Sequence, residues 1–332
     1  MQAYYLGADI GGTKTQALVA DEHGTILGSG NSGPGNHESV GYEGQFQELS
    51  AACSKALSAA GLKNTQLSAA GFGIAGYDWL TERNAIHQNI NTVLGGSTPF
   101  TVVNDALVGL AAGSSSGWGI AVVSGTGCNC WGWDETRTRI GRVTGAGMIM
   151  GEGAGASEII QKAVEHIAHQ WTMRGPATKL SDAMMSLTHT QTIEELLEGL
   201  LRGHFELDAS AAPLVFEIAN QGDAVAQGII QWAGHELAEM VNAVIRQLNF
   251  ADQDFEVIKV GSLLNYFPQL STVMENEIHT TAPYARILPL FTPPAVGGII
   301  LAMEKHQGEI SIQSRREMLS AMQVQLNKDP SN

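Results

Sequence analysis

Two glycine-rich turns, each placed directly after an apolar segment with the pattern of a strand, constrain this chain more than any other feature. The first is Gly11-Gly12-Thr13, and the second is Gly125-Thr126-Gly127. Glycines let the backbone approach an anion closely, and the N–H groups of such a turn can bind phosphate together with the threonine hydroxyl. One turn of this kind is weak evidence, but a nucleotide clamped between two domains needs a phosphate loop from each side. The pair therefore predicts a phosphate-binding cleft between two domains.

The residues around the first turn narrow its chemistry further. Asp9 ends the preceding strand, and Lys14 follows Thr13. The GxxxxGK[ST] spacing of a P-loop is not met, and a strand rather than a helix is expected to follow, so the pattern argues against a P-loop NTPase. An ordinary glycine hairpin is the alternative interpretation. For a nucleotide-binding turn, we expect Asp9 to hold Mg²⁺ through water.

Length and composition indicate a two-domain globular protein. The chain has 332 residues, more than one hydrophobic core usually holds, and 44% of them are hydrophobic. A net charge of −15 and scattered basic residues argue against a surface for nucleic acid or for an anionic membrane. The three cysteines form no CxxC pair, and they suit a reducing compartment better than a disulfide framework. The longest apolar stretch, 294–303, is too short to span a bilayer. We therefore expect a cytoplasmic protein.

The strand and helix patterns indicate a mixed α/β architecture. The expected strands of the first part are Tyr4 to Asp9, Thr15 to Ala20, Thr25 to Ser29, Ala69 to Ile74 and Phe100 to Val103, and the expected helices run from about Tyr42 to Ala60 and from Trp79 to Thr92. A Gly/Ser cluster at 113–117 separates this part from a second, more helical one. We expect domains at 1–116 and 117–299, with a helix from the 300–332 tail completing the first. For the polar end of that tail, a docked helix and disorder both remain open.

Two further strand ends supply candidate site residues. Asp105 follows an apolar strand that runs into Asn104, and at a cleft its carboxylate could act as a general base toward a substrate hydroxyl. Capping of the following helix is the alternative role for Asp105, and the two roles can coexist. Gly261-Ser262 follows the strand Phe255 to Val260, where the backbone can pass beneath an adenine or ribose.

Taken in order, the segments DIGGTKT, VVNDA, VVSGTGCN and VGSLL resemble the phosphate-1, catalytic-aspartate, phosphate-2 and adenosine motifs of the acetate kinase, hexokinase and actin superfamily. The segments Gly35-Asn36-His37 and 145–153 look like the BadF/BadG/BcrA/BcrD-type ATPase family, which includes N-acetylglucosamine kinase. The resemblance implies an α/β, two-domain actin-like ATPase fold of the ribonuclease H-like type, with an interdomain cleft. It also implies ATP and Mg²⁺ as cofactors and an amino sugar as the small-molecule substrate. The first choice of reaction is phosphorylation of N-acetylglucosamine at its 6-hydroxyl.

The same resemblance implies roles for individual residues, with Asp105 as the catalytic base. The residues implied at the nucleotide and its metal are Asp9, Gly11, Gly12, Thr13, Lys14, Gly125, Thr126, Gly127, Gly261 and Ser262. The residues implied at the sugar are Asn36, His37, Asp105, Cys128, Asn129, Gly145 and Glu152.

The sequence departs from the family pattern at three of these places. Ala146 replaces an aromatic residue, Cys128 stands where serine is usual, and Glu152 stands where aspartate is usual. Glucosamine or another hexosamine therefore stays open as the substrate. Cys128 and Cys130 are poorly spaced for an iron–sulfur cluster. An ATPase that acts on a protein partner and a non-catalytic nucleotide or sugar sensor remain alternative functions. A homodimer is also left open. The zinc segment of the ROK sugar kinases has no counterpart in the sequence.

Overall fold

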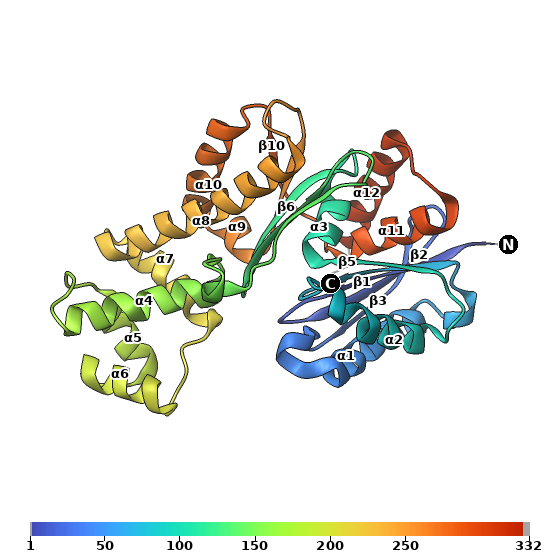
Figure 1. Cartoon of the computed structure of the whole chain (residues 1–332). Helices are drawn as coiled ribbons and strands as arrows, with labels where there is room; N and C mark the ends of the chain where they lie inside the picture. Colours follow the sequence, from blue (N-terminus) through green and yellow to red (C-terminus); the bar gives the residue numbers. More distant parts are fainter. Residues whose placement is uncertain (1, 328–332) are drawn as a thin grey trace.

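The structure is a computed structural model that describes residues 2–327, apart from the side chain of Met148. It has two lobes, and each lobe is built around a five-stranded sheet (Figure 1). The strands of the first sheet are β1 (Tyr4–Ile10), β2 (Thr15–Asp21), β3 (Ile26–Ser32), β4 (Ala69–Ile74) and β5 (Phe100–Asn104). Those of the second are β6 (Gly119–Ser124), β7 (Cys128–Trp133), β8 (Ile140–Val143), β9 (Glu256–Val260) and β10 (Arg286–Pro289).

The two sheets have the same strand order and the same strand directions. The first runs β3-β2-β1-β4-β5, with an antiparallel meander followed by two strands parallel to β1. The second runs β8-β7-β6-β9-β10, again with an antiparallel meander and two strands parallel to its first member. The turn between β1 and β2 therefore corresponds to the turn between β6 and β7. These are the two glycine-rich turns of the sequence.

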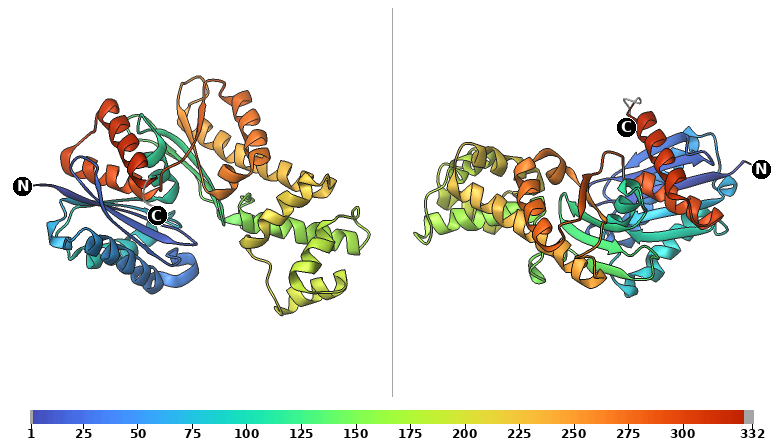
Figure 2. Two further views of the ribbon diagram at one scale, coloured as in Figure 1. Left: turned by 180° about the vertical axis from the view of Figure 1, so that it is seen from behind. Right: turned by 90° about the horizontal axis from the view of Figure 1, so that it is seen from above.

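Successive side chains of a strand point to opposite faces of the sheet, and in the first lobe they therefore enter two different hydrophobic layers. Leu6 and Ile10 of β1 pack with Leu49 and Ile86 from the helices on one face, whereas Tyr5 packs in a different cluster with Ile299. The helices of this lobe are α1 (His37–Ala59), α2 (Arg83–Leu94), α3 (Asp105–Gly113), α11 (Ala295–Gln307) and α12 (Ile312–Leu326). Figure 2 shows α11 and α12, drawn in red, beside the N-terminal strands.

The last described helix is fixed to the first sheet by both packing and hydrogen bonds. Met322 and Leu326 of α12 are buried in the same cluster as Tyr5. The side chain of Gln325 accepts from the backbone N–H of Ile26 at 2.9 Å and donates to the Ile26 carbonyl at 2.7 Å. The polar tail thus contains a docked helix, and its residues 328–332 lie outside the described part of the chain.

The second lobe adds a helical layer to its sheet. Its helices are α4 (Ala156–Trp171), α5 (Leu180–Thr188), α6 (Ile193–Arg202), α7 (Ala212–Asn220), α8 (Ala224–Leu248), α9 (Ser262–Tyr266) and α10 (Pro268–Thr281). The long helix α8 supplies Leu237, Val241 and Val244 to a core that also contains Ile120 and Val257 of the sheet. The lobe therefore has its own hydrophobic core, as expected of an independent structural unit.

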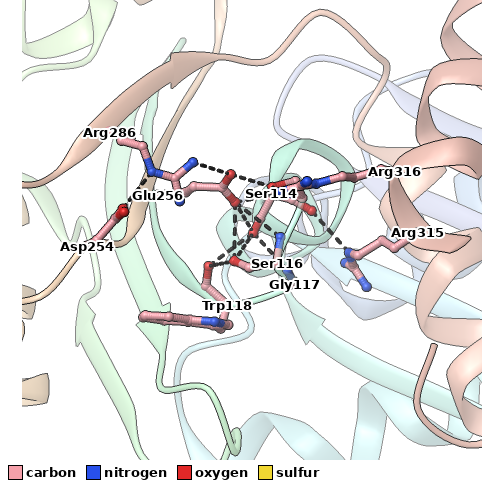
Figure 3. Close-up of polar contacts among 10 residues, drawn as sticks. Ser114, Ser116, Gly117, Trp118, Asp254, Glu256, Arg286, Arg315 and Arg316 are labelled. Atoms are coloured by element: carbon pink, nitrogen blue, oxygen red, sulfur yellow. Dashed lines mark hydrogen bonds and ion pairs between the residues drawn. The ribbon is translucent and has the colours of Figure 1, made fainter. Parts of the chain in front are cut away.

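A buried polar cluster lies where the chain passes from α3 into the second lobe (Figure 3). Glu256, at the start of β9, accepts from the hydroxyls of Ser114 and Ser115 at 2.6 and 2.7 Å. Arg315 of α12 donates to the carbonyls of Ala111 and Ser114 at 2.8 and 3.1 Å, and it pairs with Glu304 of α11 at 2.8 Å. A cation at the C-terminal end of a helix satisfies its last carbonyls and interacts favourably with its dipole. The C-terminal helix therefore stabilises the connection between the lobes.

The domain bounds of 1–116 and 117–299 stay a prediction, with one refinement that we propose. Ala295 and Ile299 of α11 already belong to the cluster that contains Tyr5 of the first sheet. We therefore place the second boundary near residue 294. Among the helices that the structure describes, none is long and apolar enough to cross a membrane.

Candidate functional site

The two glycine-rich turns meet between the lobes. The hydroxyl oxygens of Thr13 and Thr126 lie 2.9 Å apart, in hydrogen-bond contact. Both side chains are exposed, and a side-chain carbon added at Gly12 or Gly125 would meet no atom within 4 Å. Backbone N–H groups beside such open space are the groups that bind phosphate oxygens. The structure thus brings together the two turns that the sequence analysis paired.

The second turn is held by the first residues of α4. The N–H of Ala156 donates to the carbonyl of Gly125 at 2.8 Å, and the N–H of Ser157 donates to that of Thr126 at 3.0 Å. These are helix N-terminal donors that have no partner within their own helix. The carbonyls of the turn therefore point toward α4.

The third glycine element lies against the second turn. Gly261 has φ 103°, and a side-chain carbon added to it would lie 2.3 Å from the carbonyl oxygen of Ser124. Both its backbone conformation and its close approach therefore require glycine. Ser262 begins α9 and is exposed, as is Lys14 beside the first turn. The third glycine element thus adjoins the second turn, and Ser262 and Lys14 are open to solvent.

Asp105 stands at the end of β5, as the first residue of α3, and it links the lobes. The side-chain amide of Asn129, on β7 of the second lobe, donates to the Asp105 carboxylate at 2.8 Å. Asn104 is the residue that caps α3, since its side chain accepts from the N–H of Ala106 at 2.9 Å. Asp105 also accepts from this N–H, at 3.0 Å. Asn129 and Ala106 both donate to the same Asp105 oxygen, Oδ1. Because Asn104 caps the helix, the other oxygen of Asp105, Oδ2, is not needed for capping.

The carboxylates of Asp9 and Asp105, at the seam where the two lobes meet, favour bound protons or cations. Burial raises the pKa of Asp105, although its hydrogen bond from Asn129 acts in the opposite direction. Burial and, next, the charge of Asp105 raise the pKa of Asp9 to about 7, and Lys14 partly offsets this rise. Such carboxylates suit a divalent cation, because Mg²⁺ is bound in proteins by one or two carboxylates together with water and phosphate. Within residues 2–327, no group of three or more His, Cys, Asp or Glu side chains could hold a metal by itself.

Asn36 and His37 have different surroundings. Asn36 caps α1 by accepting from the N–H of Glu38 at 3.0 Å, and its amide also donates to the Glu38 carboxylate at 3.2 Å. The His37 side chain is buried, stacks on Tyr42 with ring centres 4.9 Å apart, and lies 3.7 Å from Glu82. The imidazole of His37 is thus enclosed by its own lobe, whereas Asn36 is only half-buried.

The loop at 144–152 is organised by Glu152. Its carboxylate accepts from the N–H groups of Gly145 and Ala146 at 2.6 and 2.9 Å, and from the Thr144 hydroxyl at 3.2 Å. Gly145 has φ 76°, and a side-chain carbon there would overlap the carbonyl of Cys128. Glu152 therefore uses its carboxylate to shape the loop that faces Cys128.

The side chain of Cys128 faces the core of the second lobe. Its sulfur accepts from the N–H of Ala154 at 3.1 Å, and burial raises the pKa of the thiol to about 12. Any contact of Cys128 with a sugar would therefore have to come from its backbone. Cys130 is fully buried as well, and burial raises its thiol pKa.

The sequence analysis missed Asp78, which follows β4. Asp78 is 8% exposed, and its carboxylate accepts from the side chain of Asn104 at 2.9 Å. Burial and then the charge of Asp105, with Glu38 and Glu82 beyond it, raise the pKa of Asp78 to about 7. One signal could have found this residue: β4 and β5 are parallel neighbours, and the carboxyl ends of parallel strands form the ligand-binding edge of such sheets.

Comparisons with known proteins agree with this arrangement. The BadF/BadG/BcrA/BcrD ATPase family profile matches residues 6–302. The chain is 24% identical over 311 residues to the N-acetyl-D-glucosamine kinase of Dictyostelium discoideum, covering 90% of this chain and 97% of the relative. It is 27% identical over 301 residues to the N-acetylmuramic acid/N-acetylglucosamine kinase of Clostridium acetobutylicum, covering 90% and 98%.

Solved structures confirm the predicted two-domain α/β fold. A Chromobacterium violaceum protein assigned as an N-acetylglucosamine kinase superposes with a TM-score of 0.65 at 19% identity, over 90% of this chain and 98% of the other. The ROK family glucokinase of Streptomyces griseus gives 0.59 at 18% identity, over the same shares. The match of the family profile over nearly the whole length shows that the chain belongs to the BadF/BadG/BcrA/BcrD ATPase family.

Proposed function

We propose that the chain is an ATP-dependent kinase that phosphorylates an amino sugar, with N-acetylglucosamine as the first choice and its 6-hydroxyl as the acceptor. The observation that carries this proposal is the position of Asp105. It lies at the seam of the two lobes, bound by Asn129 from the opposite lobe, and beside two glycine-rich turns that meet through Thr13 and Thr126. A general base next to a two-sided phosphate site is what transfer of a phosphoryl group to a hydroxyl requires.

In this mechanism the phosphates of ATP lie between the two turns, and the hydrogen bond between Thr13 and Thr126 is exchanged for bonds to phosphate oxygens. Gly261 and Ser262 border the adenosine. Asp105 accepts the proton of the sugar hydroxyl while the hydroxyl oxygen bonds to the γ-phosphorus and the bond from that phosphorus to ADP breaks. A raised pKa makes Asp105 a stronger base than an exposed aspartate, so burial favours this role.

The buried carboxylates of Asp9 and Asp105 fit a divalent cation, and Asp9 would hold Mg²⁺ through water. When bound, it neutralises the charge on the phosphate oxygens. Asp9 carries a pKa of about 7 because it is buried beside Asp105, and a cation there would favour its ionised form. Lys14 contributes a second positive charge on the exposed side of the first turn.

The sugar would be bound on the side of Asp105 that carries Asn36, Asn129 and the loop containing Gly145. Two relatives whose names include N-acetylglucosamine kinase support the choice of sugar. Ala146 offers less surface than an aromatic residue would, and Glu152 is engaged by backbone N–H groups of its own loop. Glucosamine and other hexosamines therefore remain the competing substrates within this proposal.

The experiment that tests the function is coupled ADP release with Mg-ATP and a panel of N-acetylglucosamine, N-acetylmuramic acid, glucosamine, N-acetylmannosamine and glucose. We expect one amino sugar to stimulate turnover strongly. Asp105→Asn should lower kcat by about 10²- to 10⁴-fold and leave ATP binding nearly intact, the range for loss of a general base. Asp182→Asn, an exposed position on α5, is the matched control and should change neither quantity.

Two outcomes would contradict this assignment. Full turnover in Asp105→Asn would remove Asp105 from its role, and no stimulation by any sugar would favour an ATPase that acts on a protein partner. The predictions of a cytoplasmic location, of a possible homodimer and of no nucleic-acid partner also remain proposals. Gel filtration coupled to light scattering addresses the homodimer.

A further inference from the structure

Arg142 is a residue of the second lobe whose side chain reaches the first. It lies on β8, and its guanidinium donates to the backbone carbonyl of Asp78 at 2.6 Å. The guanidinium carbon is 5.6 Å from the ring centre of Trp79 in the first lobe and 5.4 Å from that of Trp131 in its own. Cation–π contact with two rings and a charged hydrogen bond converge on this one side chain.

The backbone of Arg142 is fixed firmly within the second lobe. Its N–H donates to the side chain of Gln247 on α8 at 2.8 Å, and the Gln247 amide donates back to the Arg142 carbonyl at 3.1 Å. Because both backbone groups are bound to the longest helix of that lobe, the side chain projects from a rigid base. Its contact with the first lobe therefore depends on how the two lobes sit against each other.

The segment that Arg142 contacts, residues 75–79, lies between a residue of the proposed sugar side and the helix that begins with the proposed base. We call it the β4 loop. At one end Gly76 lies against the side chain of Asn36, since a carbon added to Gly76 would be 2.8 Å from the Asn36 amide oxygen. At the other end Asp78 is bound by Asn104, the residue that caps the helix beginning with Asp105. A displacement of the β4 loop would therefore disturb both the sugar side and the base.

We propose that Arg142 is a positioning residue that latches the second lobe onto the β4 loop and so couples closure of the cleft to sugar binding. The inference rests on the proposed function for its link to the sugar, but the latch itself is a contact of the protein without ligand. Arg142 acts through Asp78 and Trp79, and it needs no contact with the reacting atoms. The electrostatics agree, because the charge of Arg142 lowers the pKa of Asp78 and so opposes the rise caused by burial and by the neighbouring carboxylates.

The first test uses the kinetics of the substrate identified by the panel. Arg142→Ala should raise the KM for the sugar by about 10- to 100-fold, the loss expected for a cation–π contact and a charged hydrogen bond together, with a smaller change in kcat. Arg142→Lys should recover part of this loss, because it keeps the charge but not the planar guanidinium. Arg139→Ala is the matched control: Arg139 precedes the same strand, but its guanidinium bonds to Asp134 and Leu248 within its own lobe.

A double-mutant cycle with Trp79→Ala separates a shared contact from two independent ones. If Arg142 and Trp79 act as one latch, the double variant should raise the KM by clearly less than the product of the two single effects. The cycle of Trp79 with Arg139 should be multiplicative. Multiplicative effects for Trp79 with Arg142 would overturn the proposal.

The second test needs no substrate and so does not depend on the proposed function. Small-angle scattering of the ligand-free protein should give a larger radius of gyration for Arg142→Ala than for the wild type, and Trp79 should become more accessible to acrylamide. Arg139→Ala should match the wild type in both. If Arg142→Ala and Arg139→Ala do not differ in ligand-free scattering, the latch is refuted, even for an active kinase. A wild type without sugar-dependent turnover refutes the kinase instead, and the scattering result still decides the latch.

Discussion

Removal of the charge of Asp78 should stabilise the fold in a way that depends on pH. The pKa of Asp78 is about 7 in the folded protein, because of burial and of nearby carboxylates, and close to 3.9 in an unfolded chain. The folded state therefore binds this proton more tightly, and stability is lost as the pH rises from about 4 to about 7. A difference of about 3 pKa units corresponds to about 4 kcal/mol above pH 7, and to about 1 to 2 kcal/mol at pH 5.

Asp78→Asn removes this cost and keeps the bond from the Asn104 amide, since the new side-chain oxygen can accept it. We expect the variant to exceed the wild type in free energy of unfolding by up to about 4 kcal/mol at pH 8, and by about 1 to 2 kcal/mol at pH 5. Urea titrations at both pH values, followed by circular dichroism, measure the two differences. Asp252→Asn, an exposed position before β9, is the control and should change little at either pH. A stability difference that is the same at pH 5 and pH 8 would refute the electrostatic reasoning.

Two further predictions concern the connection between the lobes and the third glycine element. Arg315→Met should lower the free energy of unfolding by about 3 kcal/mol, because the carbonyls of Ala111 and Ser114 lose their donor. Glu304 would keep its ion pair with Arg137. Arg316 is exposed and lies beside Arg315 in Figure 3, and Arg316→Met should change little in the same urea titration. Gly261→Ala should lower the free energy of unfolding by about 2 to 4 kcal/mol and abolish ATP turnover, because the new carbon would overlap the Ser124 carbonyl at a positive φ. Gly228→Ala on α8 is the control: a side-chain carbon there meets no atom within 4 Å, so the free energy of unfolding should rise by up to about 1 kcal/mol. An active Gly261→Ala enzyme would contradict this prediction.

The regular elements could be predicted from the sequence where one signal was sufficient. The strand at Ala69 to Ile74 has the predicted bounds, because an unbroken run of small and apolar residues suits a strand buried on both faces. The first helix begins at His37 rather than near Tyr42, because Asn36 caps it. Gly41, with φ 70°, interrupts the helical periodicity there and hid the start. Apolar runs thus predicted this strand, and the irregular backbone at Gly41 accounts for the difference at the start of α1.

The site was predictable only where residues adjacent in sequence form one loop. The two phosphate turns carry their chemistry within a few residues, so they could be recognised and paired. Asp78, Asn104 and Arg142 come from three separate segments that share no motif. The contact of Asp78 with Asn104 depends on the pairing of β4 with β5, and that of Asp78 with Arg142 on how the lobes are placed. Side-chain direction was equally hidden: the sequence alone does not reveal that the Cys128 thiol faces the core.

The shared strand order of the two sheets makes the chain an internal duplication in three dimensions, although its sequence shows no repeat. Thr13 and Thr126 occupy equivalent turns of the two copies and touch each other, so they lie close to the local axis that relates the copies. A perfectly symmetric molecule could not distinguish the donor side of such a site from the acceptor side. The end of β5 carries Asp105, whereas the corresponding end of β10 is followed by Leu290. Under the proposed function, Asp105 is thus one of the differences between the two halves that would give phosphoryl transfer its direction, which the shared turns alone cannot do.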